Sequence, residues 1–250
     1  MNTETKRVRQ PRRTYARVQR ELGEVIAQHD SLTKLPSEPE LAETLHVSRA
    51  TLREVLRIYE SRGLIRRQQG VGTFVVSTPQ VLESGIEVLE SVESLAKRQG
   101  VNVTMRGLSV SERAANETEA TMFALDPGAS LLEVRRVMVN EARPIAYLVD
   151  VLPEGVLGAD ELDHGFTGSV LDLLLRRGKP RLTQSTAEIQ AVPAPMEITR
   201  ALQVQRDSVL LTFDAKLYAE GDRLVDLSQS YFLPGYFRFH VVRRVGEAVS

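Results

Sequence analysis

The amino-acid sequence predicts an α+β protein of two domains, a helical N-terminal domain and a larger domain built on an antiparallel sheet. Apolar residues first recur at helical spacing, and later segments alternate at strand spacing between tight turns. A length of 250 residues accommodates two ordinary domains. The charge is also divided: residues 1–78 hold 14 basic and 9 acidic side chains, whereas residues 79–250 hold 18 and 24. A basic piece of this kind suits a polyanionic partner, although a solvated tail is an equal alternative.

The composition excludes several classes of protein. Apolar residues make up 42% of the chain and charged residues 26%, as in ordered soluble proteins. The absence of cysteine excludes a disulfide scaffold, a thiolate metal site and a cysteine nucleophile. No apolar run approaches the ~20 residues of a membrane helix, and the basic N-terminus lacks the apolar stretch of a secretory signal. We therefore expect a cytoplasmic protein with no membrane segment, no metal and no cofactor.

The first domain is expected to span residues 15–76, after a basic, flexible arm over residues 1–14. Ser37 followed by Glu40 is a capping box, and Ser48 is a second N-cap. These signals predict helices over residues 15–28, 38–46 and 48–62, strands over residues 64–68 and 73–76, and a linker over residues 77–88.

The second domain is expected to span residues 89–245. Its consecutive strands are joined by short hairpin turns, which makes the sheet antiparallel. Ser169 and Gly178 mark the start and the stop of a helix. The predicted helices cover residues 81–99, 116–125, 169–178 and 194–203, and the predicted strands cover residues 101–110, 131–139, 143–152, 183–192, 208–219 and 223–233.

Three helices and a hairpin within about 65 residues form the pattern of a winged helix-turn-helix. Arg49, Arg53 and Arg57 are spaced by four residues and share the face opposite the apolar stripe of the third helix. Arginines there can enter the major groove and bind guanine edges or phosphates. Ser48 and Thr51 supply hydroxyl groups for phosphates near the helix start. One arginine alone would indicate only a solvated face, but the repetition favours DNA binding.

The stretch LPSEPELAETLHVSRATLREVLRIYESRGLIRRQQGVGTFV, residues 35–75, resembles the winged-helix domain of the GntR family of bacterial transcription regulators. The resemblance implies double-stranded DNA as a partner. The implied DNA contacts are Ser48, Arg49, Ala50, Thr51 and Arg53 on the recognition helix, and Gln69 and Gly70 at the tip of the wing. Pro39 stands where family members usually have an arginine. We expect the basic arm to supply the missing charge.

Residues 89–245 resemble the UTRA effector domain of the HutC subfamily, whose fold is similar to chorismate lyase. The segments that carry the resemblance are LLEVRRVMVNEARPIAYLVDVLP (131–153), SVLDLLLRRG (169–178) and LVDLSQSYFLPGYFRFHVV (224–242). The resemblance implies a domain that binds a small-molecule effector, often a sugar phosphate or an amino-acid derivative, and thereby alters DNA affinity. It also implies a homodimer and, most commonly, a repressor that the ligand relieves.

The expected effector contacts are Arg136 and Ser169, together with Tyr147, Asp226 and Tyr231, for which a structural role is the favoured alternative. Strand alternation puts Arg136 among apolar side chains, where it is either a member of a buried ion pair or an anion ligand. Ser169 opens a helix whose free N–H groups suit an anion, and plain capping is the alternative. The subfamily's ligand-binding pattern supports both positions.

Uncharged residues stand at several positions where family pockets for sugar phosphates commonly carry charge: Met138, Leu148, Leu233 and Gly235. We therefore expect a less polar ligand, with one carboxylate or phosphate held by Arg136 and the helix start. Hexosamine phosphates are expected not to bind.

Three other functions remain open: a chorismate-lyase-like enzyme fused to a DNA-binding domain, a DNA-binding protein without a ligand, and an RNA-binding protein. The four histidines are scattered, and the sequence contains no HExxH, GxSxG, Walker loop or strand-embedded GxGxxG. We therefore expect no catalytic residues. The deep, narrow major groove of RNA excludes a helix. One recognition helix reads too few base pairs for specificity, which favours a homodimer on a two-fold operator.

Overall fold

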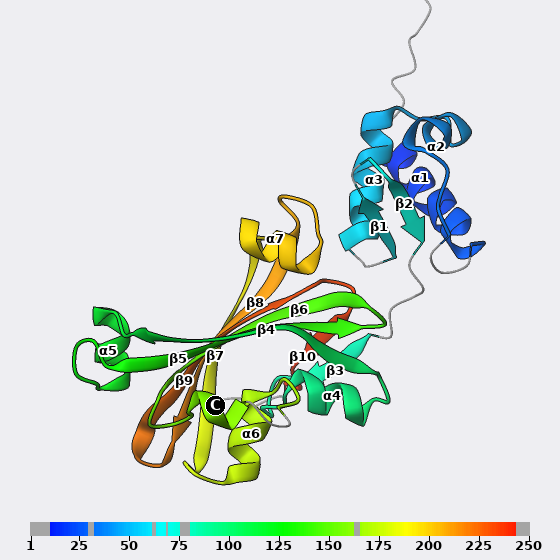
Figure 1. The fold of residues 1–250 in the computed structure, drawn as a ribbon. Helices are drawn as coiled ribbons and strands as arrows, with labels where there is room; N and C mark the ends of the chain where they lie inside the picture. Colours follow the sequence, from blue (N-terminus) through cyan, green and yellow to red (C-terminus); the bar gives the residue numbers. More distant parts are fainter. Residues whose placement is uncertain are drawn as a thin grey trace, which may run out of the picture. The chain divides into compact units, whose positions relative to one another are not determined.

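The structure of the protein is a computed structural model that describes residues 11–29, 33–61, 64–68, 70–75, 81–162 and 166–243 (Figure 1). The chain divides into two compact units, Met1–Pro79 and Gln80–Ser250. Each unit has its own hydrophobic core.

The first unit is a winged helix-turn-helix. Its elements are α1 (Pro11–Ala27), α2 (Glu38–Thr44), α3 (Arg49–Ser61), β1 (Ile65–Gln68) and β2 (Gly72–Val75). β1 and β2 pair as an antiparallel hairpin. The backbone N–H of Leu35 donates to the carbonyl of Thr73 at 2.8 Å, and the segment before α2 makes an isolated antiparallel bridge from Lys34 to Phe74 of β2. The predicted order of three helices and a hairpin is confirmed.

The apolar stripes of the three helices meet in one core. The backbone N–H of Ser37 donates to Glu40 Oε2 at 2.7 Å, as the predicted capping box requires. His46 adopts a left-handed conformation with φ of 50°, which turns the chain between α2 and α3 within a few residues. The buried members of the core include Val18, Leu22, Ile26, Leu41, Leu45, Leu52, Val55, Leu56, Tyr59 and Ile65.

The expected boundary of the basic arm is wrong at its C-terminal end. α1 begins at Pro11, so residues 11–14 belong to a helix. Proline is tolerated in the first turn of a helix, because no backbone N–H there has an intrahelical partner. The rest of the expected arm, residues 1–10, lies outside the described residues, as do Gly63, Val76 and residues 77–80 of the expected linker.

The second unit is built on a six-stranded antiparallel sheet in the order β4-β5-β6-β9-β8-β7. Its strands are β4 (Val103–Ala114), β5 (Ser130–Asn140), β6 (Arg143–Pro153), β7 (Leu182–Pro193), β8 (Val209–Ala219) and β9 (Arg223–Phe232). Its helices are α4 (Val92–Arg98), α5 (Glu117–Phe123), α6 (Val170–Arg177) and α7 (Met196–Leu202), with 3-10 turns at Ala159–Leu162 and Glu220–Asp222. The predicted α+β class and antiparallel sheet are confirmed.

Helices cover both faces of this sheet (Figure 1). On one face, here called the α4/α6 face, α4 and α6 pack on two apolar clusters that include Leu132, Val134 and Met138. On the other, the α5/α7 face, α5 packs on Leu131 and α7 on Val137. The alternation predicted for residues 131–139 is therefore confirmed, and both faces of β5 are buried.

The helix predicted over residues 81–99 is wrong in its first half, and so is the linker predicted over 77–88. Residues Leu82–Gly85 form β3, which pairs in parallel with β10 (Phe237–His240). Only α4 is helical, and Ile86 and Leu89 of the predicted stripe are 42% and 51% exposed. The backbone partner of β3 comes from the far end of the chain. Local periodicity carries no information about such a partner.

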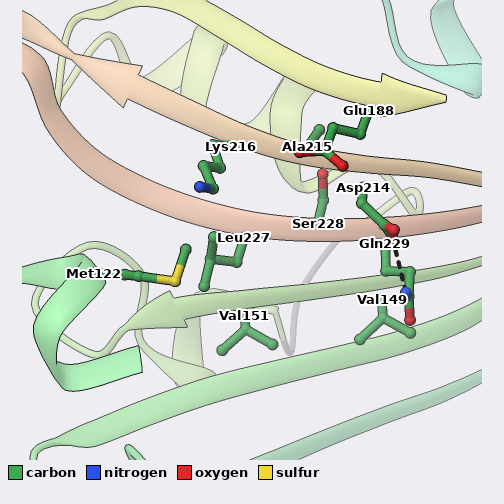
Figure 2. A pocket seen from close by; sticks show the side chains of 10 residues that line it. All are labelled: Met122, Val149, Val151, Glu188, Asp214, Ala215, Lys216, Leu227, Ser228 and Gln229. Carbon is green, nitrogen blue, oxygen red and sulfur yellow. Dashed lines mark hydrogen bonds between the residues drawn. The ribbon is translucent and has the colours of Figure 1, made fainter. Parts of the chain in front are cut away.

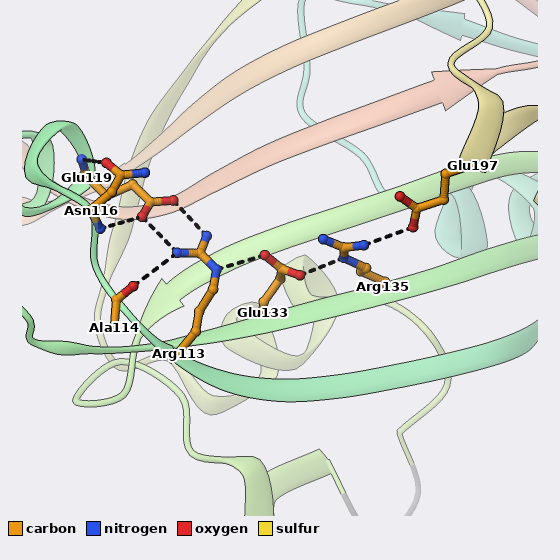
Figure 3. A network of polar contacts seen from close by, with 7 residues as sticks. All are labelled: Arg113, Ala114, Asn116, Glu119, Glu133, Arg135 and Glu197. Atoms are coloured by element: carbon orange, nitrogen blue, oxygen red, sulfur yellow. Dashed lines mark hydrogen bonds and ion pairs between the residues drawn. The ribbon is translucent and has the colours of Figure 1, made fainter.

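A chain of ion pairs joins α5 and α7 to the sheet on the α5/α7 face (Figure 3). Glu133 accepts from Arg113 Nε at 2.9 Å and from Arg135 Nε at 2.6 Å. Arg113 also pairs with Glu119 of α5 at 2.6 Å, and Arg135 with Glu197 of α7 at 2.8 Å. Burial alone would raise the pKa of Glu133, but hydrogen bonds from the two arginines outweigh burial, and its pKa is lowered.

Replacing Glu133→Gln is expected to lower the free energy of unfolding by about 1–3 kcal/mol near neutral pH, because two guanidinium groups lose their shared partner. The folded-state pKa of Glu133 lies below its ordinary value of 4.5, so the stabilisation is present above that value. It is lost as the pH falls through the folded-state pKa. Urea unfolding of the unaltered chain and of Glu133→Gln at neutral and acidic pH measures this stabilisation. A difference in the free energy of unfolding that is equal at both pH values would contradict the stabilising role of the Glu133 carboxylate.

Candidate functional site

The recognition helix α3 presents one buried and one exposed face. Ser48 caps it, because Ser48 Oγ accepts from the backbone N–H of Thr51 at 3.1 Å and lies 2.9 Å from Thr51 Oγ1. Arg49, Arg53 and Arg57 are exposed on the face opposite the buried Leu52, Val55, Leu56 and Tyr59. The Tyr59 hydroxyl donates to the carbonyl of Gln19 at 2.6 Å and ties the helix to α1. The predicted display of arginines on one face is therefore present.

One carboxylate holds two arginines beside this face. Arg53 Nε donates to Glu38 Oε2 at 2.7 Å, and Arg67 of β1 pairs with the other oxygen of Glu38. Burial alone would raise the pKa of Glu38, but the hydrogen bond from Arg53 and the charge of Arg67 outweigh it, and the pKa is lowered. The Arg53 side chain remains 56% exposed. Glu38 was not predicted from the sequence, because its partners lie on other elements, 15 and 29 residues away.

The remaining expected DNA contacts lie on the same unit. Ala50 is exposed and Thr51 is half-buried on α3. Gly70 is exposed in the hairpin turn with φ of 76°, a conformation that glycine adopts without strain. Gln69 lies outside the described residues. The recognition helix and the hairpin turn thus both belong to the basic N-terminal unit.

Arg136 is the centre of a buried polar cluster on the α4/α6 face of the second unit. Its side chain pairs through Nη1 with Asp150 of β6 and donates through Nε to the carbonyl of Gly168. Arg136 is only 4% exposed. Of the two roles that the sequence left open for Arg136, the buried ion pair is the one present in the structure.

Ser169 begins α6 and is buried in the same cluster. Its Oγ accepts from the backbone N–H of Asp172 at 2.9 Å, so the hydroxyl caps the helix. The Asp172 carboxylate in turn accepts from Ser91 Oγ at 2.7 Å and from Ser94 Oγ at 3.0 Å, both on the first turn of α4. The N-termini of α4 and α6 are therefore joined through one carboxylate.

Two further carboxylates reach this cluster. Asp226 of β9 is 4% exposed, and burial, reinforced by the charge of Asp150, raises its pKa well above the ordinary value. Burial raises the pKa of Glu93 on α4 to about 7, with Arg136 opposing and Asp172 and Asp150 adding to the rise. Within the described residues, Asp226 Oδ1 and Glu93 Oε1 are buried without a hydrogen-bond partner.

Glu93, Asp150 and Asp172 were not predicted from the sequence. A usable signal existed for Asp150, which stands between Val149 and Val151 in an apolar strand. A charged residue in such a strand needs a partner of opposite charge nearby. No comparable signal marked Glu93 or Asp172, because each lies on the first turn of a helix, where acidic residues are ordinary.

The structure does not bring Tyr147 and Tyr231 to this cluster. Both lie on the α5/α7 face, with ring centroids 6.4 Å apart. The Tyr147 hydroxyl donates to Glu197 Oε1 at 3.2 Å, and that of Tyr231 to Gln229 Oε1 at 2.7 Å. Neighbouring residues of a strand point to opposite faces, so Tyr147 cannot share a face with Arg136 when its cross-strand partner is Val137. The five expected effector contacts therefore do not form one site.

A separate surface pocket of about 350 Å³ lies on the α5/α7 face (Figure 2). Val149, Val151 and Leu227 contribute its apolar part. Gln229 Nε2 donates to Asp214 Oδ1 at 2.8 Å at its edge. Among the residues that the structure describes, no group of three His, Asp or Glu side chains is placed to hold a metal ion. No helix in the described parts of the chain could cross a membrane.

A winged helix-turn-helix with an arginine-bearing recognition helix, joined to a sheet domain with a buried polar cluster, defines a two-domain DNA-binding regulator. Residues 14–75 match the family described as bacterial regulatory proteins, gntR family, and residues 98–238 match the UTRA domain. The chain belongs to the GntR family of transcription regulators, in the branch that carries a UTRA domain.

Named relatives agree with this assignment. The chain is 27% identical over 209 residues to the histidine utilization repressor of Pseudomonas putida, covering 82% of this chain and 83% of that protein. It is 25% identical over 205 residues to the HTH-type transcriptional repressor NagR of Bacillus subtilis, with 82% and 83% covered. The crystal structure of PhnF from Mycobacterium smegmatis matches with a TM-score of 0.62 at 20% identity, covering 92% of this chain and all of that one. This last likeness confirms the fold.

Replacing Arg49→Ala is expected to weaken binding to a specific DNA site by about tenfold or more, because each base-edge or phosphate contact of this kind contributes ~1–3 kcal/mol. Arg53→Ala is expected to do the same. Fluorescence anisotropy with labelled duplex measures the loss. Arg98→Ala, an exposed arginine on α4 of the other unit, is the matched control and leaves the affinity unchanged. Normal binding by Arg49→Ala would mean that α3 is not the recognition helix.

Proposed function

We propose that the protein is a transcriptional repressor that binds operator DNA as a homodimer and responds to a small-molecule effector in its UTRA domain. The observation that carries the DNA-binding part is the row of exposed arginines on α3, with the Ser48 cap at the helix start. Glu38 holds Arg53 together with the largely buried Arg67 of β1 beside this row. Relatives named as repressors support the repressor role.

The effector-binding part rests on the polar cluster on the α4/α6 face. Arg136, Ser169 and Asp226 belong to it, and of the expected contacts these three remain candidates. The site binds its ligand without converting it, so the protein is a regulator and not a chorismate-lyase-like enzyme. Recovery of an effector chemically unchanged after prolonged incubation supports this; a product would favour the enzyme. We place the protein in the cytoplasm, with its operator.

The regulatory mechanism is a shift between two populations of the dimer. The first turn of α4 is bonded to α6 through Asp172, and β3 lies just before α4 at the start of the second unit. A ligand that changes the position of α4 therefore acts on the segment that leads to the DNA-binding unit. A coupling free energy of ~1–3 kcal/mol would change operator affinity ~5–150-fold.

Selection from a pool of random duplexes with the full chain is expected to enrich a two-fold symmetric sequence, because a dimer presents two recognition helices to two half-sites. Light scattering of the free protein is expected to give the mass of a dimer. Selection with Arg49→Ala serves as the control and enriches no sequence. A monomer that enriches a single asymmetric site would contradict the dimeric mode of binding.

Removal of residues 1–10 is expected to reduce the dependence of DNA affinity on salt. This segment contains Lys6, Arg7 and Arg9, and each phosphate contact contributes a slope of about −0.9 in the logarithm of affinity against the logarithm of salt concentration. Anisotropy titrations at several salt concentrations measure the slope. An unchanged slope would show that the segment does not supply the positive charge that Pro39 lacks.

A further inference from the structure

The polar cluster on the α4/α6 face contains more carboxyl groups than basic groups. Around the guanidinium of Arg136 lie the carboxylates of Glu93, Asp150, Asp172 and Asp226. Asp150 is paired with Arg136, and Asp172 accepts two serine hydroxyls. Glu93 Oε1 and Asp226 Oδ1 are the buried oxygens left without a partner in the described part of the chain.

Buried oxygens without a hydrogen-bond partner are rare in native proteins because they destabilise the folded state. A buried polar group without a hydrogen bond costs ~1–3 kcal/mol, and more when it is charged. Nearly all buried polar groups are therefore satisfied, and an exception indicates a missing water, ion or ligand. Here the two exceptions lie on either side of one buried ion pair, because Glu93 Oε1 lies against Gly168, whose carbonyl accepts from Arg136, and Asp226 is the diagonal cross-strand neighbour of Asp150. Their coincidence points to one ligand.

The cluster does not suit an anion. Arg136 already pairs with Asp150 and donates to the Gly168 carbonyl, and Ser169 Oγ already caps α6. A carboxylate or phosphate would have to displace these contacts. A group with charged N–H donors favours the ionised form of both carboxyl groups and supplies the hydrogen bonds that their free oxygens lack.

We propose that the effector of this protein carries a positively charged nitrogen, as an ammonium or guanidinium group, which binds between the carboxylates of Glu93 and Asp226. The proposal rests on the proposed function, because it names the chemical class of ligand that the second unit senses. It departs from the anionic ligand expected from Arg136 and Ser169 alone.

The two carboxylates come from different layers of the unit. Asp150 pairs with Ser228 across the sheet, which makes Asp226 its diagonal neighbour on the same face. Glu93 enters from α4 and lies against Gly168, where an added Cβ would come within 2.6 Å of Glu93 Oε1. A cation held by both carboxylates therefore ties α4 to the sheet. In the proposed mechanism, the ligand acts by changing the position of α4.

Proton release accompanies this binding. Glu93 is faced by Arg136 of β5, Asp150 of β6 and Asp172 of α6, and burial raises its pKa to about 7. A cationic ligand favours ionised carboxylates, so protonated Glu93 and Asp226 lose their protons when the ligand binds. Affinity for an amine that stays charged throughout is then expected to rise as the pH increases through about 7. A ligand bound as an anion would show the opposite dependence.

The test uses the full chain and three probes matched in length: 1,4-diaminobutane, 1,4-butanediol and succinate, at equal ionic strength. The diamine is expected to raise the Tm by about 2–4 °C or more, with a larger shift above neutral pH than below it. The diol and succinate are expected to leave the Tm unchanged. A larger shift with succinate or inorganic phosphate overturns the proposal. So does a shift with magnesium chloride alone, or no shift with the diamine at about 10 mM.

Variants locate the binding. Glu93→Gln and Asp226→Asn are each expected to raise the Tm of the ligand-free protein, because a buried carboxylate with an unpartnered oxygen is removed, and to abolish the diamine shift. Glu133→Gln is the matched control: this buried carboxylate lies on the opposite face with two arginine partners, so its loss lowers the Tm and leaves the diamine shift intact. A diamine shift that survives in both Glu93→Gln and Asp226→Asn overturns the proposal.

Measuring the binding of the selected duplex tests the proposed function independently of the cationic effector. DNA binding by the ligand-free, unaltered chain depends on α3 and is expected without any diamine. Normal DNA binding with no diamine shift in the unaltered chain would reject the cationic effector and leave the regulator intact. Failure of the unaltered chain to select any DNA would reject the regulator, whatever the diamine does.

Discussion

The buried ion pair between Arg136 and Asp150 is the constraint on which the second unit depends. A buried guanidinium is tolerated only when charge and hydrogen bonds compensate for its loss of water. Asp150 supplies the charge, and the Gly168 carbonyl supplies a hydrogen bond from the segment that opens α6. The pair thereby joins the helical layer to the sheet between two apolar clusters, and it determines which groups nearby can remain charged.

The two units use arginine and carboxylate in opposite proportions. In the first unit, Glu38 holds Arg53 and Arg67, which leaves a surplus of positive charge beside the recognition helix. In the second, Arg136 stands among several carboxyl groups in a buried site, and the pKa values of Glu93 and Asp226 are raised. The first arrangement suits a polyanion, and the second is the basis of the proposed cationic effector.

Local signals in the sequence were sufficient where the structure is governed by neighbours within a turn. The capping box of Ser37 and Glu40 and the N-caps Ser48 and Ser169 act over three residues, and each is present as predicted. The alternation predicted for β5 is also confirmed. Successive side chains of a strand point to opposite faces even when both faces are buried. Register against other strands has no local signal, so the sequence does not predict that Tyr147 points to the face opposite Arg136.

Periodicity and capping operate at short range, so the winged helix-turn-helix, the antiparallel sheet domain and the arginines on the exposed face of α3 can be predicted from the sequence. That residues Leu82–Gly85 form a strand is evident only in the folded chain, because their partner β10 lies at the other end of the sequence. Folding alone also brings Glu93, Asp172 and Asp226 around Arg136. Those residues come from four separate elements, and the loss of water that shifts the pKa of Glu93 and Asp226 arises only when the elements pack.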